Sequence, residues 1–404
     1  MQCLPFFVLL LDPANTGGLA RRCCTSILSL HIFGFLLIFL TSRLKRLYSM
    51  NMENSVKPGR DVALDLVRVA AIFLVLLQHA SEYYYIGPNL SVIHENCGLL
   101  AWLNSLSRIC VPLFVMISGY FVLPMKTDTP TFFRHRFSRV LFPWLFWCVA
   151  YAVYFVFYRG DSVGECLGNI CRIPLNWGVE VGHLWYVYMI VGLYLLVPII
   201  SPWLSSSSKR ELQGYLALWL LTTLQPYLHH AGINLWGEAT WNMTPTFYYF
   251  AGFGGYFLLG HYVRRFGVPS AWLSALLLVG GYIFTALDFN HFTTFAKDAV
   301  ELEIPWDFCC LNVALMTLAV FSLLSKVKIN PESRVARLIT SISVCSFAMY
   351  LAHIMVLNFF HDLWDSVLPV AAAIPAITIC TFIVTYLIVL CLSRLPKGKY
   401  WLGI

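Results

Sequence analysis

Long apolar blocks recur along most of the chain, and many have close to the roughly 20 residues that a helix needs to cross about 30 Å of hydrocarbon. Backbone N–H and C=O groups inside a bilayer must be satisfied within their own segment, so each block is expected to form a helix. The sequence therefore predicts an all-α, polytopic membrane helix bundle with about ten transmembrane helices. The predicted spans are 62–83, 101–123, 138–158, 183–203, 212–229, 246–263, 270–289, 306–325, 338–360 and 369–393.

Charged residues are too scarce for a water-exposed globule. They make up 12% of the 404 residues, whereas 59% are hydrophobic, and soluble domains carry about 25% charged residues. One membrane domain is expected over residues 56–404, with any chemistry inside the bundle or at its mouths.

Residues 1–55 form a separate N-terminal extension. Their apolar stretch 26–42 ends in basic residues and is either an extra helix or part of a misassigned start upstream of Met50 or Met52. The second interpretation is preferred, because residues 1–49 carry no polar side chain suited to chemistry.

Lysine and arginine concentrate in alternate loops, and this distribution predicts the orientation. By the positive-inside rule the basic loops are cytoplasmic, which places the N-terminal arm and the C-terminus inside. The formal charge of +7 does not indicate nucleic-acid binding, because the basic residues sort by loop. The basic loops hold Lys57, Arg60, Lys126, Arg134, Arg136, Arg139, Lys209, Arg210, Arg264, Arg265, Lys326, Lys328, Arg334, Arg337, Arg394, Lys397 and Lys399, whereas the alternate loops hold Arg159, Arg172 and Lys297.

The thirteen cysteines lie mostly inside apolar segments and show no CxxC or Cys/His ligand spacing, so no metal site is predicted. Cys166 and Cys171 share a predicted external loop, where they either form a disulfide or remain free thiols. The free thiols are preferred.

The first span carries three ionisable residues. Asp65, Arg68 and His79 fall on one helical face, with His79 about 16 Å beyond Arg68 along the axis. Ionisable groups within a span usually face the bundle interior or a wet cavity, and histidine is well suited to take a proton from a hydroxyl. The alternative is an interfacial histidine bonded to a neighbouring helix, with Asp65–Arg68 as a local ion pair, and the sequence favours neither.

A basic cluster precedes the third span. Arg136 and Arg139 are one helical turn apart, so both guanidinium groups are able to address one phosphate, and Arg134 lies close by. An ordinary positive-inside anchor is the alternative, and on this cluster alone it is preferred.

Six further residues are expected either to line a substrate path or to serve packing. Pro112 and the Ser118–Gly119 pair inside the second span let another backbone or a ligand come close. Packing is preferred for Ser118, and core or interfacial positions are preferred for the histidines. The six residues are Arg108, Ser118, Tyr120, His183, Trp185 and His353.

Four stretches, taken in order, make the chain resemble the membrane acyltransferase family 3, the multi-spanning O-acyltransferases of cell-envelope polysaccharides. They are LDxxR with the following His79, VPLFVMISGYF (111–121), RFSRVLFPW (136–144) and GHLWYV (182–187), and a YLAH (350–353) follows later. The resemblance covers roughly residues 60–394. Within the family, the chain is most similar to single-domain sugar O-acetyltransferases such as the enterobacterial common antigen enzyme. One departure is a short loop between the second and third spans, where Arg134 competes with Arg136.

The resemblance implies an enzyme of the bacterial cytoplasmic membrane that transfers an acyl group, expected to be acetyl, to an extracytoplasmic or lipid-linked glycan. Acyl-CoA is the expected donor substrate, with no permanently bound cofactor and no metal. Its phosphates would dock on Arg136 and Arg139 beside Arg68, with the thioester reaching His79. His79 would either deprotonate a sugar hydroxyl or carry the acyl group covalently. Arg139→Ala is accordingly expected to raise the requirement for acyl-CoA.

Two other functions compete with the enzyme. A transporter or flippase of a lipid-linked sugar or small acid would line its path with Asp65, Arg68 and His79, but transporters often show two related halves, and none is evident. A non-catalytic assembly partner would keep its function in His79→Ala, whereas the enzyme would lose it.

Overall fold

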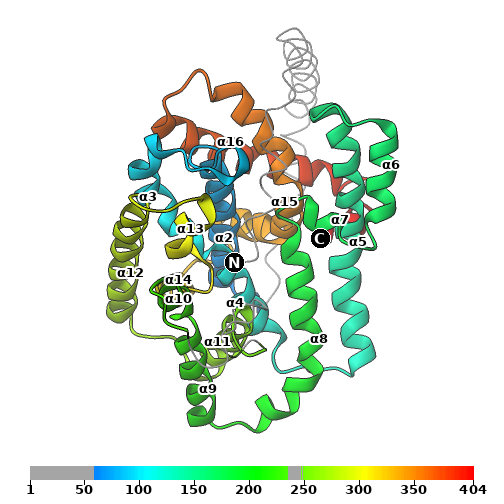
Figure 1. Cartoon of the computed structure of the whole chain (residues 1–404). Coiled ribbons are helices and arrows are strands. Elements are labelled where there is room, and N and C mark those ends of the chain that lie inside the picture. The colour runs from blue at the N-terminus through cyan, green and yellow to red at the C-terminus, as the bar shows by residue number, and fades with distance from the viewer. Residues whose placement is uncertain (1–58, 235–246, 248) are drawn as a thin grey trace.

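The structure is a computed structural model that describes residues 59–234, 247 and 249–404 (Figure 1). The part described is helical, and its only strand-like pairing is an isolated bridge between Ile86 and Val92. The extra helix that the sequence suggested within residues 1–55 lies outside the described residues.

Eight helical segments of the described chain are long and apolar enough to cross a membrane, which confirms the all-α polytopic bundle. They include α2 (Val62–Glu82), α5 (Thr129–Tyr158), α8 (Trp185–Ser206), α12 (Ala271–Phe292), α15 (Arg334–Trp364) and α16 (Val370–Leu392). The other two are composite. The second long segment joins η3 (His94–Asn96), α3 (Cys97–Ser105), η4 (Leu106–Ile109) and α4 (Cys110–Val122), and the sixth joins η6 (Ile304–Trp306) to α14 (Leu311–Ser325).

The remaining two predicted spans, 212–229 and 246–263, are shorter helices than expected. The first is divided into α9 (Lys209–Thr222) and α10 (Gln225–His230), and the second contains α11 (Phe253–Phe266). The 14 residues of α9 or of α11 extend about 21 Å, less than the about 30 Å of a bilayer core. Two crossings by these segments, or none, would leave the start of α12 on the same side of the membrane.

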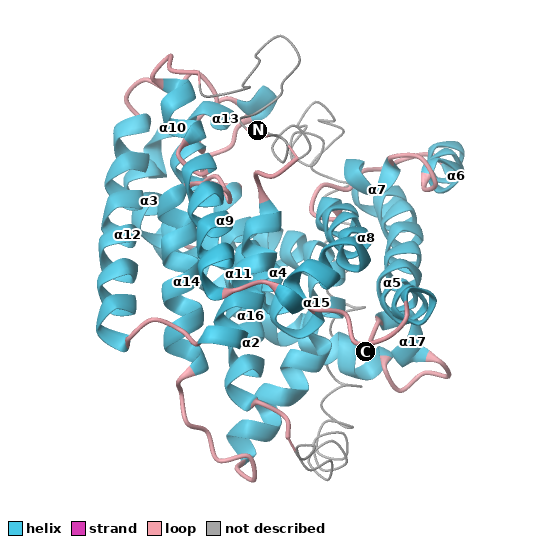
Figure 2. Ribbon diagram, turned by 90° about the horizontal axis from the view of Figure 1, so that it is seen from below, coloured by secondary structure: helices cyan, strands magenta, loops and turns pink. Residues whose placement is uncertain are grey.

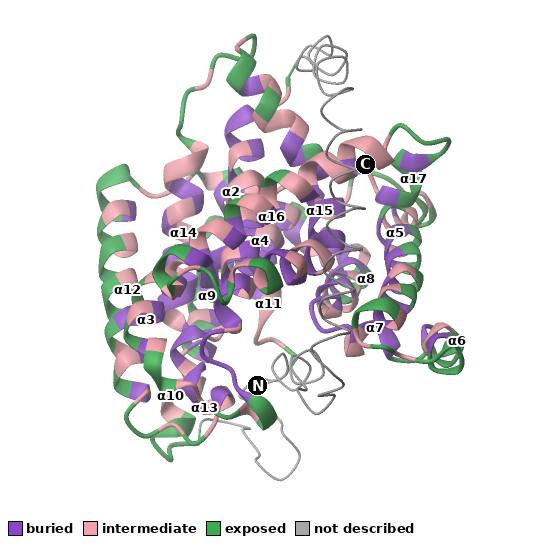
Figure 3. Cartoon of the chain, turned by 90° about the horizontal axis from the view of Figure 1, so that it is seen from above, coloured by how far each residue is buried: buried purple, intermediate pink, exposed green. Residues whose placement is uncertain are grey.

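The helix α2 lies in the middle of the bundle and contacts α4, α15 and α16 (Figure 2). Its apolar residues Val67, Ala71, Ile72 and Leu76 are buried in the core, whereas α12 is largely exposed at the periphery (Figure 3). Asp61 caps α2, because its side chain accepts from the backbone N–H groups of the first turn.

The helices α4 and α11 cross at very short range through two glycines. A Cβ atom on Gly119 would lie 1.9 Å from the Phe257 carbonyl oxygen, and one on Gly260 would lie 2.0 Å from the Met116 carbonyl oxygen. Small residues let membrane helices approach in this way. The Ser118–Gly119 pair therefore brings another backbone close, as the sequence suggested.

Short helices lie between the long ones. The helices α6 (Val163–Arg172) and α7 (Trp177–Glu180) join α5 to α8, and α6 projects at the margin of the bundle (Figures 2 and 3). Cys166 and Cys171 both lie in α6 and are free, Cys166 buried and Cys171 exposed. The other short elements are η2 (Pro88–Leu90), α13 (Ala299–Leu302) and α17 (Gly398–Leu402).

Candidate active site

Asp65 ties the first turn of α2 to α15. Its carboxylate pairs with Arg60 at 2.6 Å and with Arg68 at 3.4 Å, and it also accepts from Ser343 at 2.6 Å and Thr340 at 3.2 Å. The side chain is 2% exposed, and these partners hold it in place. These contacts orient Arg68 through its ion pair with Asp65.

His79 forms a pair with Glu82 on the next turn of α2. Its Nδ1 lies 2.7 Å from Glu82 Oε2. Because a carboxylate accepts hydrogen bonds, Nδ1 of neutral His79 carries the proton and Nε2 is the basic atom. A carboxylate in this position fixes the imidazole tautomer and stabilises the imidazolium, as in hydrolase triads.

Glu82 is itself held in place by neighbouring polar groups. Its other oxygen accepts from Gln78 Nε2 at 3.2 Å, and Gln78 Oε1 accepts from the Cys110 thiol at 3.1 Å. The carboxylate is 5% exposed. Glu82 therefore has a fixed orientation toward His79. The sequence analysis missed it, although the His-x-x-Glu spacing puts both residues on one helical face.

Three histidines that the sequence singled out meet at one place. The ring centroid of His79 lies 5.2 Å from that of His353 and 6.4 Å from that of His183, and the last two lie 4.9 Å apart. They come from α2, α15 and the turn before α8. We call His79, His183 and His353 the histidine cluster.

Two tyrosines fix the other members of the histidine cluster. The Tyr350 hydroxyl donates to the His183 carbonyl, and the Tyr151 hydroxyl lies 3.4 Å from His183 Nε2. His353 Nδ1 donates to the Tyr350 carbonyl at 2.6 Å, which leaves its buried Nε2 as an acceptor without a partner in the described part of the chain. His183 and His353 are thus buried, and His353 keeps a nitrogen acceptor without a partner in the described part of the chain.

A row of polar side chains connects the histidine cluster with Arg68 and Arg136. Tyr186 on α8 contacts Tyr350, with ring centroids 5.4 Å apart, and two turns later Tyr194 lies within electrostatic range of both arginines. The Ser118 hydroxyl lies beside both Tyr186 and Tyr194. We call this row the polar seam. Its members are Arg136, Arg68, Tyr194, Ser118, Tyr186 and Tyr350.

Arg68 and His79 both point into the bundle. The Arg68 guanidinium lies over the Phe121 ring of α4 at 4.9 Å, and the side chains of Arg68 and His79 are 28% and 12% exposed. The uninterrupted helix between them keeps them about 16 Å apart. The expected common face is thus present.

The three arginines of the basic cluster are placed differently on α5. Arg136 lies over Phe132 at 5.9 Å and faces Tyr194, which places it in the polar seam. Arg134 and Arg139 are exposed, and the Arg139 carbonyl packs against Gly403 after α17. Arg136 is therefore the one of the three that the structure brings toward Arg68.

Three of the expected lining residues also contact other parts of the bundle. Arg108 is 2% exposed and forms an ion pair with Glu303 at 3.3 Å, with its guanidinium over the Trp306 ring. Tyr120 accepts from Arg264 through its carbonyl, and Trp185 stacks with Phe308. Arg108 also lies within electrostatic range of Glu82, and Trp185 lies beside Tyr186 with ring centroids 6.4 Å apart. Ser118, which donates back to the Phe114 carbonyl at 2.8 Å, combines packing with a place in the seam.

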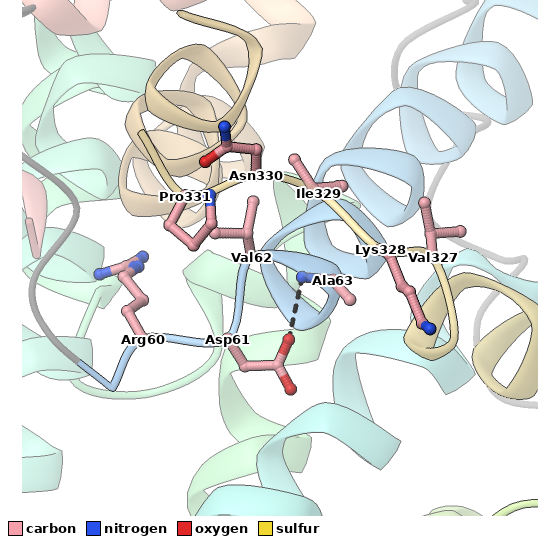
Figure 4. Close-up of a pocket in the computed structure, with 9 residues that line it drawn as sticks. All are labelled: Arg60, Asp61, Val62, Ala63, Val327, Lys328, Ile329, Asn330 and Pro331. Atoms are coloured by element: carbon pink, nitrogen blue, oxygen red, sulfur yellow. Dashed lines mark hydrogen bonds between the residues drawn. The ribbon is translucent and has the colours of Figure 1, made fainter. Parts of the chain in front are cut away.

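A pocket of about 480 Å³ opens beside the N-terminal end of α2 (Figure 4). It is lined by residues 60–63 of that end and by residues 327–331, which follow α14. It carries the cations Arg60 and Lys328 and lies at the same end of α2 as Arg68. The described residues include no group of three or more metal-ligating side chains that could hold an ion.

The fold and the site define a polytopic helical membrane protein with an acid–base pair in its interior. The sequence of residues 61–391 matches the family model of an acyltransferase domain. The chain therefore belongs to the membrane acyltransferase family 3, and it is an O-acyltransferase that transfers groups other than aminoacyl groups. No curated protein and no solved structure matches it.

Proposed function

We propose that the protein transfers an acyl group, specifically acetyl, from cytoplasmic acetyl-CoA to a hydroxyl of an extracytoplasmic or lipid-linked glycan of the bacterial cell envelope. The observation that carries this proposal is the His79–Glu82 pair at one end of the polar seam, with Arg68 and Arg136 at the other. The sequence resemblance to single-domain sugar O-acetyltransferases such as the enterobacterial common antigen enzyme supports acetyl transfer to a sugar. The protein is proposed to lie in the inner membrane with its C-terminus in the cytoplasm.

The donor is held at the arginine end of the seam. Arg68 and Arg136 bind the CoA phosphates, since a guanidinium binds phosphate in a bidentate manner. Asp65 keeps Arg68 in position through their ion pair. The pantetheine arm has an extended length of about 15–20 Å, close to the axial distance from Arg68 to His79. The charged CoA head group therefore does not need to cross the membrane.

The transfer itself needs only one base. His79 Nε2 takes the proton of the acceptor hydroxyl as its oxygen attacks the thioester carbonyl carbon. A C–O bond forms and the C–S bond breaks. The CoA thiolate leaves and takes the proton back from His79, so that the products are the O-acyl glycan and CoA-SH. Glu82 stabilises the imidazolium between these two proton transfers.

Transfer of label from radiolabelled acetyl-CoA tests the proposal. Wild-type membranes are expected to label a glycan, and His79→Ala membranes with equal protein content are expected to label it about 10²–10⁴-fold more slowly. A transporter would instead accumulate unmodified solute. Transfer that is undiminished in His79→Ala would contradict the proposed role of the histidine.

A further inference from the structure

A second polar cluster lies one helical turn beyond the histidine cluster. Directly after α2 it begins with Tyr83, four residues after His79, and on α15 with Asn358, five residues after His353. On α5, Tyr154 lies three residues after Tyr151, which touches His183. These steps correspond to about 4–8 Å along the three helices. The second cluster therefore lies on the side of the histidines away from Arg68.

Hydrogen bonds and stacked rings join the members of this second cluster. Asn358 accepts from the Tyr83 hydroxyl and donates to the Tyr154 hydroxyl at 3.1 Å. Tyr83 stacks on His361 with centroids 3.9 Å apart, and Tyr154 stacks on Tyr158 at 5.1 Å. Aromatic faces with a few fixed polar groups are typical of small-molecule sites. The outer cluster is Tyr83, Tyr154, Tyr158, Arg159, Asn358 and His361.

Arg159 supplies an unpaired cation at the edge of the outer cluster. Its guanidinium lies over the Phe155 ring at 3.8 Å. Its buried Nε and Nη2 atoms have no hydrogen-bond partner in the described part of the chain. Asp161 attracts it electrostatically, but the two form no ion pair. A buried donor without a partner is costly, and a guanidinium fork suits a carboxylate or a phosphate.

We propose that the outer cluster is the acceptor site, and that Arg159 binds an anionic group of the sugar acceptor. The inference rests on the proposed transfer to a glycan hydroxyl and adds the chemical class of the acceptor. Tyr83, Tyr154 and Asn358 hold the sugar ring over the histidine cluster. Its carboxylate or phosphate reaches Arg159, about 12 Å beyond Tyr151 along α5.

Binding of simple sugars to the purified full-length protein in lipid nanodiscs tests this site. Glucuronate, glucose 1-phosphate, glucose and inorganic phosphate are titrated, and the shift in melting temperature gives the affinity of each. At least one of the two anionic sugars is expected to bind more tightly than both glucose and inorganic phosphate. A preference for glucuronate identifies a carboxylate acceptor, and a preference for glucose 1-phosphate identifies a phosphorylated one.

Variants of two arginines complete the test. Arg159→Gln is expected to weaken binding of the preferred anionic sugar about tenfold or more, because a charge-assisted hydrogen bond is lost. Arg172→Gln is the matched control, since Arg172 is exposed on α6 and is paired with Glu180. The melting temperatures without ligand show whether both variants are folded. Arg159→Lys, which keeps the charge without the fork, provides a second folded variant with an intermediate affinity.

Three results would overturn the inference: glucose binding as tightly as the anionic sugars, inorganic phosphate binding as tightly as both, or an unchanged preference in Arg159→Gln. His79→Ala separates the inference from the proposed function. That variant is expected to keep the preference for the anionic sugar over glucose and inorganic phosphate while transfer is lost. If it keeps transfer, the proposed role of His79 fails and the binding result still stands.

Discussion

At the residue scale, the His79–Glu82 pair is the smallest unit on which the proposed chemistry depends. Nδ1 of His79 faces a carboxylate that Gln78 also holds. A histidine with one nitrogen fixed in this way presents the other as a base of defined direction. The two residues therefore act as one unit, and changing either should affect the same step.

Glu82→Gln should slow the chemical step without weakening donor binding. The amide keeps the size of the side chain but no longer stabilises the imidazolium. We expect kcat for acyl transfer to fall by about 10²-fold or more, with the KM for acetyl-CoA unchanged. Steady-state kinetics with labelled acetyl-CoA check this result. Gln78→Met, one residue before His79, should reduce kcat less, and a Glu82→Gln enzyme within twofold of wild type would disprove the role of the pair.

The basic cluster gives a second prediction on single residues. Arg136 faces Tyr194 in the polar seam, whereas Arg134 and Arg139 are exposed. Arg136→Ala should therefore raise the KM for acetyl-CoA more than Arg139→Ala or Arg134→Ala does, by about tenfold or more for a lost charge-assisted contact. Equal effects of all three substitutions would indicate a diffuse electrostatic anchor.

At the element scale, the helix crossing of α4 and α11 fixes the wall behind Ser118. Gly119 has no space for a methyl group, because the Phe257 carbonyl oxygen would lie 1.9 Å from it. The two helices must separate to accept any side chain there. Since Ser118 and Phe121 border the polar seam, this crossing also sets the position of groups around Arg68.

Gly119→Ala should destabilise the protein by about 1–3 kcal/mol, which is typical of overpacking. The melting temperature in detergent measures the effect. Gly192→Ala on α8 is the control, because a Cβ atom there would have no neighbour within 4 Å, and it should leave the melting temperature unchanged or raised. Equal stability of the two variants would contradict the close crossing.

The elements were predictable from hydropathy to different degrees. The long spans follow directly from their apolar length, and the alignment of Asp65, Arg68 and His79 follows from helix geometry. Hydropathy does not show that α9 and α11 are short. An apolar block of membrane length has the same hydropathy whether it forms one helix or is divided by a turn. The same helix geometry could have predicted that Glu82 faces His79, since it lies three residues later.

At the scale of the whole molecule, the histidine cluster joins parts of the chain that are far apart in sequence. His79, His183 and His353 are carried by α2, the turn before α8, and α15. Each alone looks like an ordinary core histidine, and only tertiary packing brings them together. Spacing in a single sequence does not show which distant residues come into contact. It therefore did not predict the histidine cluster, nor the places of Tyr186 and Tyr194 in the polar seam.

Cys171 offers a test of the predicted orientation. It is exposed on α6, in a segment that the positive-inside rule places outside. A membrane-impermeant maleimide added to intact cells should label wild-type protein more than Cys171→Ser protein. Labelling of Cys171 only after the cells are broken open would reverse the orientation.

The central claim is that a donor at one membrane face reaches an imidazole close to the other face through the polar seam. Sealed inside-out vesicles test it most directly, with radiolabelled acetyl-CoA supplied only to the exposed cytoplasmic face. The account predicts that label appears on glycan within the lumen in wild type and not in His79→Ala, while labelled acetyl-CoA itself stays outside. Label found only on glycan at the outer face of the vesicles, or entry of intact acetyl-CoA into the lumen, would contradict it.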